Sequence, residues 1–184
     1  MLSLLIRTYG KHIVKTPELL ILLVKILSLQ VQTELKAEKP SNQGKIIIAK
    51  CWNIIRAIGE NKVYLPVLDS IEEPLLPLFE FMQTPEKISF DEEIIALMSA
   101  MIKLQEKVSN TKWILVSTFP KVFEKNKYIF YDLFHAINLV IVHGCETLKN
   151  RSDLIEMVRH SLSELFVHYL MIVHRLGLQS DILQ

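Results

Sequence analysis

Histidine and cysteine are the residues of this sequence best suited to bind a metal, and five of the six histidines follow residue 134. His135, His143 and Cys145 fall within one predicted helix. His135 and His143 are eight residues apart and share a helix face, whereas Cys145 points elsewhere. A metal site needs more ligands that converge on one face. We therefore expect no metal here and interpret these side chains as core or rim residues.

Three further histidines, His160, His168 and His174, lie in the last predicted helix. Only His160 and His168 share a helix face, because a spacing of eight residues nearly repeats the helical turn and a spacing of six does not. Two histidines on one stripe are more typical of packing than of ligand binding, and we interpret them as packing residues.

The sequence also lacks the patterns of common enzymes. It contains no Gly-X-Ser-X-Gly elbow, and its five glycines are isolated, so none forms a glycine-rich loop for phosphate. Nucleophilic catalysis would need a base, an orienting acid and an oxyanion hole. We expect a protein without enzymatic activity, with no catalytic residue and no cofactor.

Two acidic groups and two tryptophans are the remaining candidates for binding. Acids in the first turn of a helix are stabilised by its dipole, which is the simpler interpretation of residues 91–93. The alternative is a surface that binds a basic protein partner, and we carry five residues as candidates for it: Glu72, Glu73, Asp91, Glu92 and Glu93. Trp52 and Trp113 lie on apolar helix faces, so we interpret them as core residues rather than as stacking platforms for a ligand.

Composition narrows the class of protein. Half of the 184 residues are hydrophobic, with only 5 glycines and 7 prolines, which excludes a disordered or collagen-like chain. The net charge is +1, so no electrostatic footprint for nucleic acid is visible. The two cysteines cannot form a disulfide framework or a structural zinc site, which favours a reducing compartment.

The mean hydropathy of +0.27 raises the question of a membrane segment. The longest apolar run, Leu19–Leu29, is interrupted by Lys25 and is shorter than the roughly 20 residues that a spanning helix needs. We therefore expect no membrane partner. Three basic residues precede the first acid, Glu18, and could mimic a mitochondrial presequence, but Thr16-Pro17 is more typical of an ordinary helix and turn.

Helical periodicity dominates the sequence, and no hairpin signal is present. It predicts helices at about 2–14, 17–36, 45–59, 65–83, from 89, from 110, at 129–148 and at 152–176. Ser89 and Glu92 have capping-box spacing and predict a helix start. We expect Pro74 and Pro77 to break or kink the fourth helix and Pro120 to kink the sixth, and we expect a bend in the seventh near its glycine, Gly144.

Helices joined by short loops admit a closed bundle or a solenoid. The third, fifth and seventh helices start near Lys45, Phe90 and Tyr128, a spacing of roughly 40 residues that is typical of HEAT and armadillo repeats. We predict an all-α fold, an α-solenoid of HEAT-like antiparallel helix pairs. There would be about four pairs, over residues 2–36, 45–83, 90–125 and 128–176.

The outermost helices of this array are unusually apolar. The second predicted helix is apolar nearly all round, and the eighth carries Phe166, Leu170 and Met171 beside its main apolar face. A solenoid needs polar outer faces on its terminal repeats. We therefore expect residues 1–184 to be a single array that is a segment of a longer solenoid. Its exposed ends would be covered by further repeats, a partner or self-association.

Three stretches carry a family resemblance. The first is residues 50–59 with Tyr64–Leu68, and the second starts with Phe90-Asp91-Glu92. The third is the Trp113 helix ending in Phe123-Glu124, followed by Tyr131-Asp132-Leu133. In this order and spacing they resemble the importin-beta superfamily of nuclear transport receptors. The likeness is to the branch of importins seven and eight, in the HEAT repeats past the middle of the receptor.

The resemblance covers about residues 2–160 and leaves out the tail, 161–184. It implies a segment that binds protein cargo for nuclear import and moves between cytoplasm and nucleus. Nucleoporins and Ran would be bound through the full-length receptor only, because the family binds Ran mainly through N-terminal repeats that this chain lacks. Receptors of the family are usually acidic and several times longer. The alternative is a HEAT-like structural scaffold subunit of a large complex, with no transport role.

Overall fold

The computed structural model describes residues 2–36, 41–79 and 91–181, and within these ranges the chain is helical with short turns and no strand. The helices are α1 (Leu2–Ile13), α2 (Pro17–Leu35), α3 (Asn42–Gly59), α4 (Leu68–Phe79), α5 (Asp91–Gln105), α6 (Asn110–Val116), α7 (Phe119–Lys125), α8 (Phe130–Lys149) and α9 (Ser152–Asp181). Short 3₁₀ segments, Lys62–Val67 and Lys127–Ile129, precede α4 and α8. The all-α prediction is confirmed.

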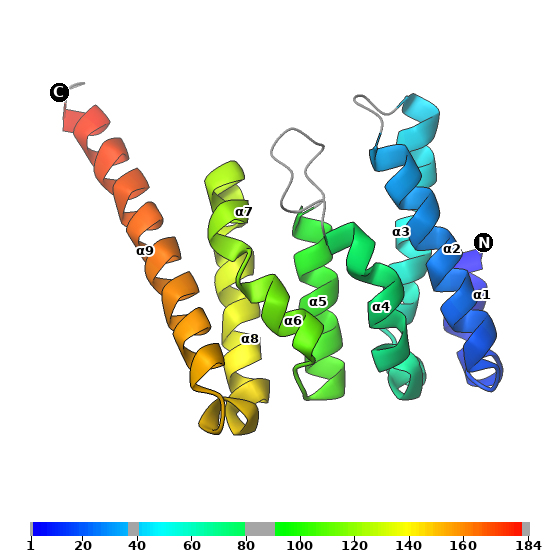
Figure 1. The fold of residues 1–184 in the computed structure, drawn as a ribbon. Helices are drawn as coiled ribbons and strands as arrows, with labels where there is room; N and C mark the ends of the chain where they lie inside the picture. The colour runs from blue at the N-terminus through cyan, green and yellow to red at the C-terminus, as the bar shows by residue number, and fades with distance from the viewer. Residues whose placement is uncertain (1, 37–40, 80–90, 182–184) are drawn as a thin grey trace.

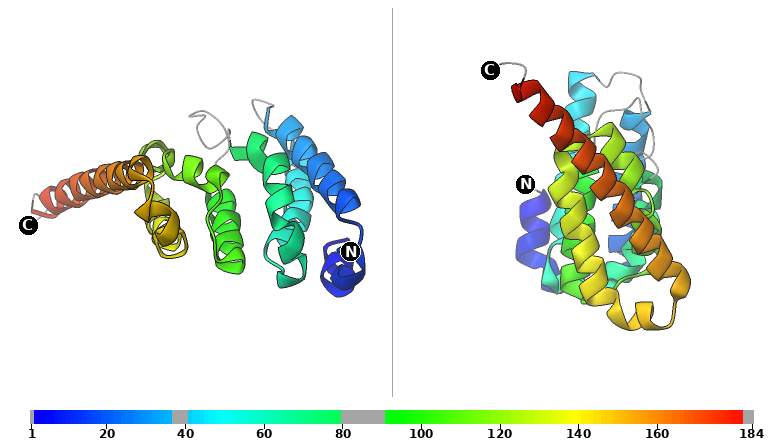
Figure 2. Two further views of the ribbon diagram at one scale, coloured as in Figure 1. Left: turned by 60° about the horizontal axis from the view of Figure 1, so that its bottom comes forward. Right: turned by 90° about the vertical axis from the view of Figure 1, so that its left-hand side faces the viewer.

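The helices form two layers in an open row, as Figures 1 and 2 show. In one layer α1 contacts α3, α3 contacts α5, and α5 contacts α8. In the other, α2 contacts α4, α4 contacts α6, and both α6 and α7 contact α9. The two ends of the chain lie at opposite ends of the row (Figure 1). This arrangement confirms the solenoid of helix pairs and excludes the closed bundle.

Prolines act in different ways on the two predicted helices that contain them in their interior. The break at Ser117-Thr118 divides the predicted sixth helix into α6 and α7, with Pro120 in the first turn of α7, as the predicted kink required. By contrast, α4 continues as one helix through Pro74 and Pro77, and it bends toward α5 without breaking (Figure 1). The irregular backbone lies earlier, in the 3₁₀ segment Lys62–Val67 that contains Pro66.

Gly144 does not interrupt α8, which runs as one helix from Phe130 to Lys149. A Cβ atom at this position would lie 2.5 Å from Cζ2 of the Trp113 ring. The glycine therefore lets the tryptophan of α6 pack directly on the α8 backbone. The predicted capping box involves Ser89, which lies outside the described residues.

The core lies between the two layers and includes six apolar side chains of the third pair. These are all at most 2% exposed: Ile95, Met98, Ile102, Trp113, Val116 and Phe119. Trp52 is 3% exposed. Both tryptophans are thus core residues, as we interpreted them.

One stretch of the described chain, Lys127–Lys149, is long and apolar enough to cross a membrane by length and composition. In this fold the same stretch is the core helix α8, whose inner face packs against α5 and α9. Core helices of soluble proteins commonly meet this criterion, so our expectation of no membrane partner stays a prediction.

Candidate functional site

The five predicted partner-binding acids do not share one surface. Glu72 on α4 is 6% exposed and Asp91 on α5 is 1% exposed, and both pair with lysines. Glu73 and Glu92 are exposed, and Glu93 is half-buried. Asp91, Glu92 and Glu93 form the first turn of α5, where the helix dipole favours them. Burial removes Glu72 and Asp91 from any surface that a partner could reach, and the other three stay candidates.

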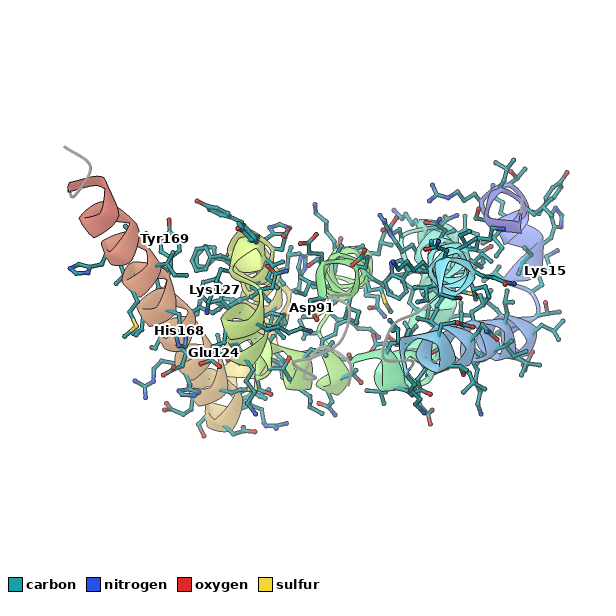
Figure 3. The ribbon with its side chains drawn as sticks, turned by 90° about the horizontal axis from the view of Figure 1, so that it is seen from above. Lys15, Asp91, Glu124, Lys127, His168 and Tyr169 are labelled. Carbon is teal, nitrogen blue, oxygen red and sulfur yellow. The ribbon has the colours of Figure 1, made fainter. Side chains whose placement is uncertain are left out.

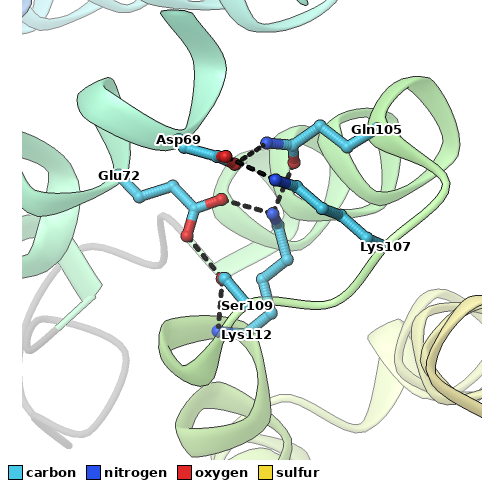
Figure 4. A network of polar contacts seen from close by, with 6 residues as sticks. All are labelled: Asp69, Glu72, Gln105, Lys107, Ser109 and Lys112. Carbon is cyan, nitrogen blue, oxygen red and sulfur yellow. Dashed lines mark hydrogen bonds and ion pairs between the residues drawn. The ribbon is translucent and has the colours of Figure 1, made fainter. Parts of the chain in front are cut away.

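Glu72 is the centre of a buried polar network that joins the second and third helix pairs (Figure 4). Its carboxylate forms an ion pair with Nζ of Lys112 and accepts a hydrogen bond from the hydroxyl of Ser109. Nζ of Lys112 also donates to Oε1 of Gln105 at 2.6 Å. Ser109 caps α6, since its Oγ accepts from the backbone N–H of Lys112. Glu72 and Lys112 therefore each have an oppositely charged partner and a further hydrogen bond.

An outer ring of the network is exposed to solvent. The carboxylate of Asp69 pairs with Nζ of Lys107 and accepts from Nε2 of Gln105 at 2.6 Å. Gln105 therefore bridges the outer pair and the buried pair (Figure 4). Exposed pairs contribute little to stability, whereas a broken buried pair leaves an uncompensated charge. The network is best described as a joint between helix pairs.

Burial lowers the pKa of the Lys112 amine, and the nearby Glu72 carboxylate opposes this shift. A second pair, Lys125 with Asp91 at 3.3 Å, links α7 to the start of α5 and so joins the two layers within the third helix pair. In each ion pair, a lysine of α6 or α7 contacts an acid on another helix, Glu72 of α4 or Asp91 of α5. These partners could not be predicted from the sequence, because acid and lysine are 40 residues apart in the first pair and 34 in the second.

Glu73 has a different environment from its neighbour Glu72. It lines a groove of about 310 Å³ between α2 and α4, opposite Lys25. Neither Glu73 nor Lys25 forms an ion pair with another described residue. The groove was not predicted, because it exists only where two helices far apart in sequence lie side by side. Glu73 therefore shares a groove with a basic group.

Apolar side chains remain exposed on the outer helices. The outer α2 stripe consists of residues at helical spacing that are 51–63% exposed: Leu19, Leu22, Ile26 and Leu29. The outer α9 stripe consists of residues that are 45–62% exposed: Phe166, Leu170, Met171 and Val173. Stripes of this kind usually mark an interface on a soluble protein.

An aromatic cluster fills the space between α7, α8 and α9. The rings of Phe130 and Tyr169 stack with centroids 4.3 Å apart, and Phe134 meets Phe166 edge to face. Figure 3 shows Tyr169 on α9 directed toward the segment that carries Lys127. This cluster could not be predicted from the sequence, because its members come from different helices. It anchors α9 and leaves Phe134 and Phe166 partly exposed at its edge.

The histidine interpretation holds for His168 but not for His160. His168 is half-buried, its ring lies near Phe123, and its Nε2 is 3.3 Å from Glu124 (Figure 3). His160 is exposed, so it is not a packing residue. Cys145 is exposed, whereas burial raises the pKa of the half-buried Cys51 thiol. In the part of the chain that the structure describes, no three potential metal ligands gather.

Comparison with known proteins returned no match among family models, curated proteins or solved structures.

Proposed function

We propose that this chain is a non-enzymatic, protein-binding solenoid. The observation that carries the proposal is the pair of apolar stripes on α2 and α9, which stay exposed on an open array of helices. Solenoids use extended surfaces to bind other proteins, and their terminal faces are normally polar. Exposed apolar stripes at helical spacing match the anchors that bind another protein surface.

More specifically, we propose a segment of an importin-beta-type nuclear transport receptor that binds protein cargo, with a preference for basic cargo. The support is the resemblance of three stretches, which fall in order on α3, on α5, and on α6 to α8. Glu73, Glu92 and Glu93 are the acids that such a cargo could reach. Nucleoporins and Ran would be bound through the full-length receptor, which would act in cytoplasm and nucleus.

The second candidate is a HEAT-like scaffold subunit that is held permanently in a large complex. The exposed stripes favour it as well, because permanent interfaces are more apolar than transient ones. The two candidates differ in their partners. A transport receptor reversibly binds Ran and the Phe-Gly repeats of nucleoporins, whereas a scaffold subunit binds neither.

The test is a pull-down with the full-length polypeptide that carries this chain, using immobilised Phe-Gly repeats and GTP-loaded Ran. We expect both baits to retain the protein. Co-purification with a fixed set of subunits through a high-salt wash, without binding to either bait, would support the scaffold instead. Residues 1–184 alone are not the right sample for the Ran bait.

A further inference from the structure

The groove between α2 and α4 has two chemically different walls. Residues on one face of α2, including Ile21, Lys25 and Leu29, form the first wall. Residues on one face of α4 form the second wall: Ser70, Glu73, Pro74 and Pro77. Its volume of about 310 Å³ lies at the lower end of the range for ligand pockets. The groove is therefore large enough for one long side chain and the main chain beside it.

The α4 wall is rich in hydrogen-bond acceptors. Pro74 and Pro77 have no backbone N–H, so they cannot donate to the carbonyls of Ser70 and Glu73, four residues earlier. Ser70 and Glu73 are exposed and line the groove. A helix carbonyl without its usual donor takes a hydrogen bond from water or from a ligand. Two such carbonyls thus belong to residues of this wall.

The carboxylate of Glu73 adds a negative charge to the same wall. Glu72, the neighbouring acid, is committed to Lys112, whereas Glu73 has no ion-pair partner among the described residues. The Glu73 carboxylate and the carbonyls of Ser70 and Glu73 are all hydrogen-bond acceptors, so together they suit a ligand with several donors. The side chain that matches is arginine, because its planar guanidinium carries five N–H donors and no acceptor.

The rest of the groove suits the remainder of an arginine-containing peptide. Ile21, Leu29 and the two proline rings are apolar and can pack on the aliphatic stem of the arginine. Lys25 on the α2 wall is exposed and forms no ion pair with another described residue, so its amine is available to a main-chain carbonyl of the same peptide.

We propose that this groove binds an arginine side chain from an extended segment of a protein partner, with the guanidinium against Glu73 and the carbonyls of Ser70 and Glu73. The inference rests on the proposed function, because it takes the partner to be a protein. It adds the place of recognition and the side chain that is recognised.

The experiment is a fluorescence-anisotropy titration of the 184-residue chain with labelled Gly-Leu-Arg-Leu-Gly and with the same peptide carrying citrulline. Citrulline keeps the shape of arginine but has no charge. We expect the arginine peptide to bind about tenfold more tightly, since charge-assisted hydrogen bonds are roughly twice as strong as neutral ones. We expect Glu73→Gln to abolish most of this difference. Pro77→Ala restores an N–H donor to the Glu73 carbonyl and should weaken the arginine peptide severalfold.

The matched control is Glu146→Gln, which neutralises an exposed acid on α8 away from the groove and should leave both affinities unchanged. Equal affinity for the two peptides, or full binding by Glu73→Gln, would overturn the proposal. If the full-length polypeptide still binds Phe-Gly repeats in that case, the groove assignment fails alone. If the full-length polypeptide binds neither Phe-Gly repeats nor Ran, the proposed transport function fails together with the groove assignment.

Discussion

At the scale of single residues, burial separates side chains that look alike in the sequence. Glu72 and Glu73 are adjacent, yet one is buried in an ion pair and the other lines a groove. Sequence could identify Trp113 as a core residue, because its apolar neighbours repeat with helical period. It could not identify the partner of Glu72, because Lys112 lies 40 residues later and reaches it only through the packing of α6 near α4.

Trp113 gives the first prediction. Replacing it by alanine should lower the free energy of unfolding by roughly 3–5 kcal/mol, because a buried aromatic ring leaves a cavity. Urea denaturation followed by circular dichroism measures the change. A loss below about 1 kcal/mol with an unchanged m-value would contradict the core assignment, because removal of a buried ring costs several times more.

Lys112 gives the second prediction. Lys112→Met should cost about 3–5 kcal/mol, because Glu72 would stay buried without a counter-charge. The double variant Glu72→Leu/Lys112→Met should recover most of that loss. Lys107→Met, which removes the exposed pair with Asp69, is the matched control and should change stability by at most about 1 kcal/mol. A single variant as stable as this control would show that the buried pair is not a joint.

The same lysine predicts a dependence on pH. Burial lowers the pKa of Lys112 below its ordinary 10.5, so in the window just below pH 10.5 the unfolded chain binds more protons than the folded chain. The contribution of Lys112 to stability therefore rises with pH in this window. The wild-type protein should gain stability relative to the Glu72→Leu/Lys112→Met variant as pH approaches 10.5. A loss of wild-type stability relative to this variant, measured by the same urea titrations, would contradict a lowered pKa of Lys112.

At the scale of helices, most boundaries could be predicted, and the bend expected at Gly144 was wrong. Caps and apolar periodicity place α1, α2 and α8 within a few residues of the structure. Pro74 and Pro77 bend α4 without breaking it (Figure 1), as a kink requires, and the residues whose carbonyls they leave without their usual donors, Ser70 and Glu73, are exposed. Gly144 does not bend α8. A glycine is needed there because the Trp113 ring of α6 packs on the α8 backbone, and sequence periodicity does not reveal a contact between two helices.

Two glycines give a prediction at this scale. Gly144→Ala should destabilise the protein by about 1–2 kcal/mol, because a clash with the rigid Trp113 ring outweighs the gain of roughly 1 kcal/mol in helix propensity. Gly59→Ala, whose Cβ would meet the flexible end of Leu97, should cost less. Thermal unfolding compares the two variants directly. A stabilised Gly144→Ala variant would mean that α6 does not press on α8.

At the scale of the whole molecule, the repeat spacing near 40 residues was enough to predict an open row of helix pairs, and the contacts confirm it. The apolar composition of the outermost helices also predicts that further repeats, a partner or self-association cover the ends of the array. The groove between α2 and α4 and the aromatic cluster on α9 could not be predicted, because each depends on how neighbouring pairs are rotated relative to one another.

The most direct measurement is light scattering on the 184-residue chain at about 100 µM. If the outer α2 and outer α9 stripes are protein-binding surfaces, the isolated chain should bury them by self-association. We expect a mass well above 21.3 kDa and binding of a hydrophobic dye. Leu22→Glu/Leu170→Glu, with one charge in each stripe, should restore the monomer. Ile114→Glu, an equally exposed position on α6, should not. A clean wild-type monomer that binds no dye would contradict the account.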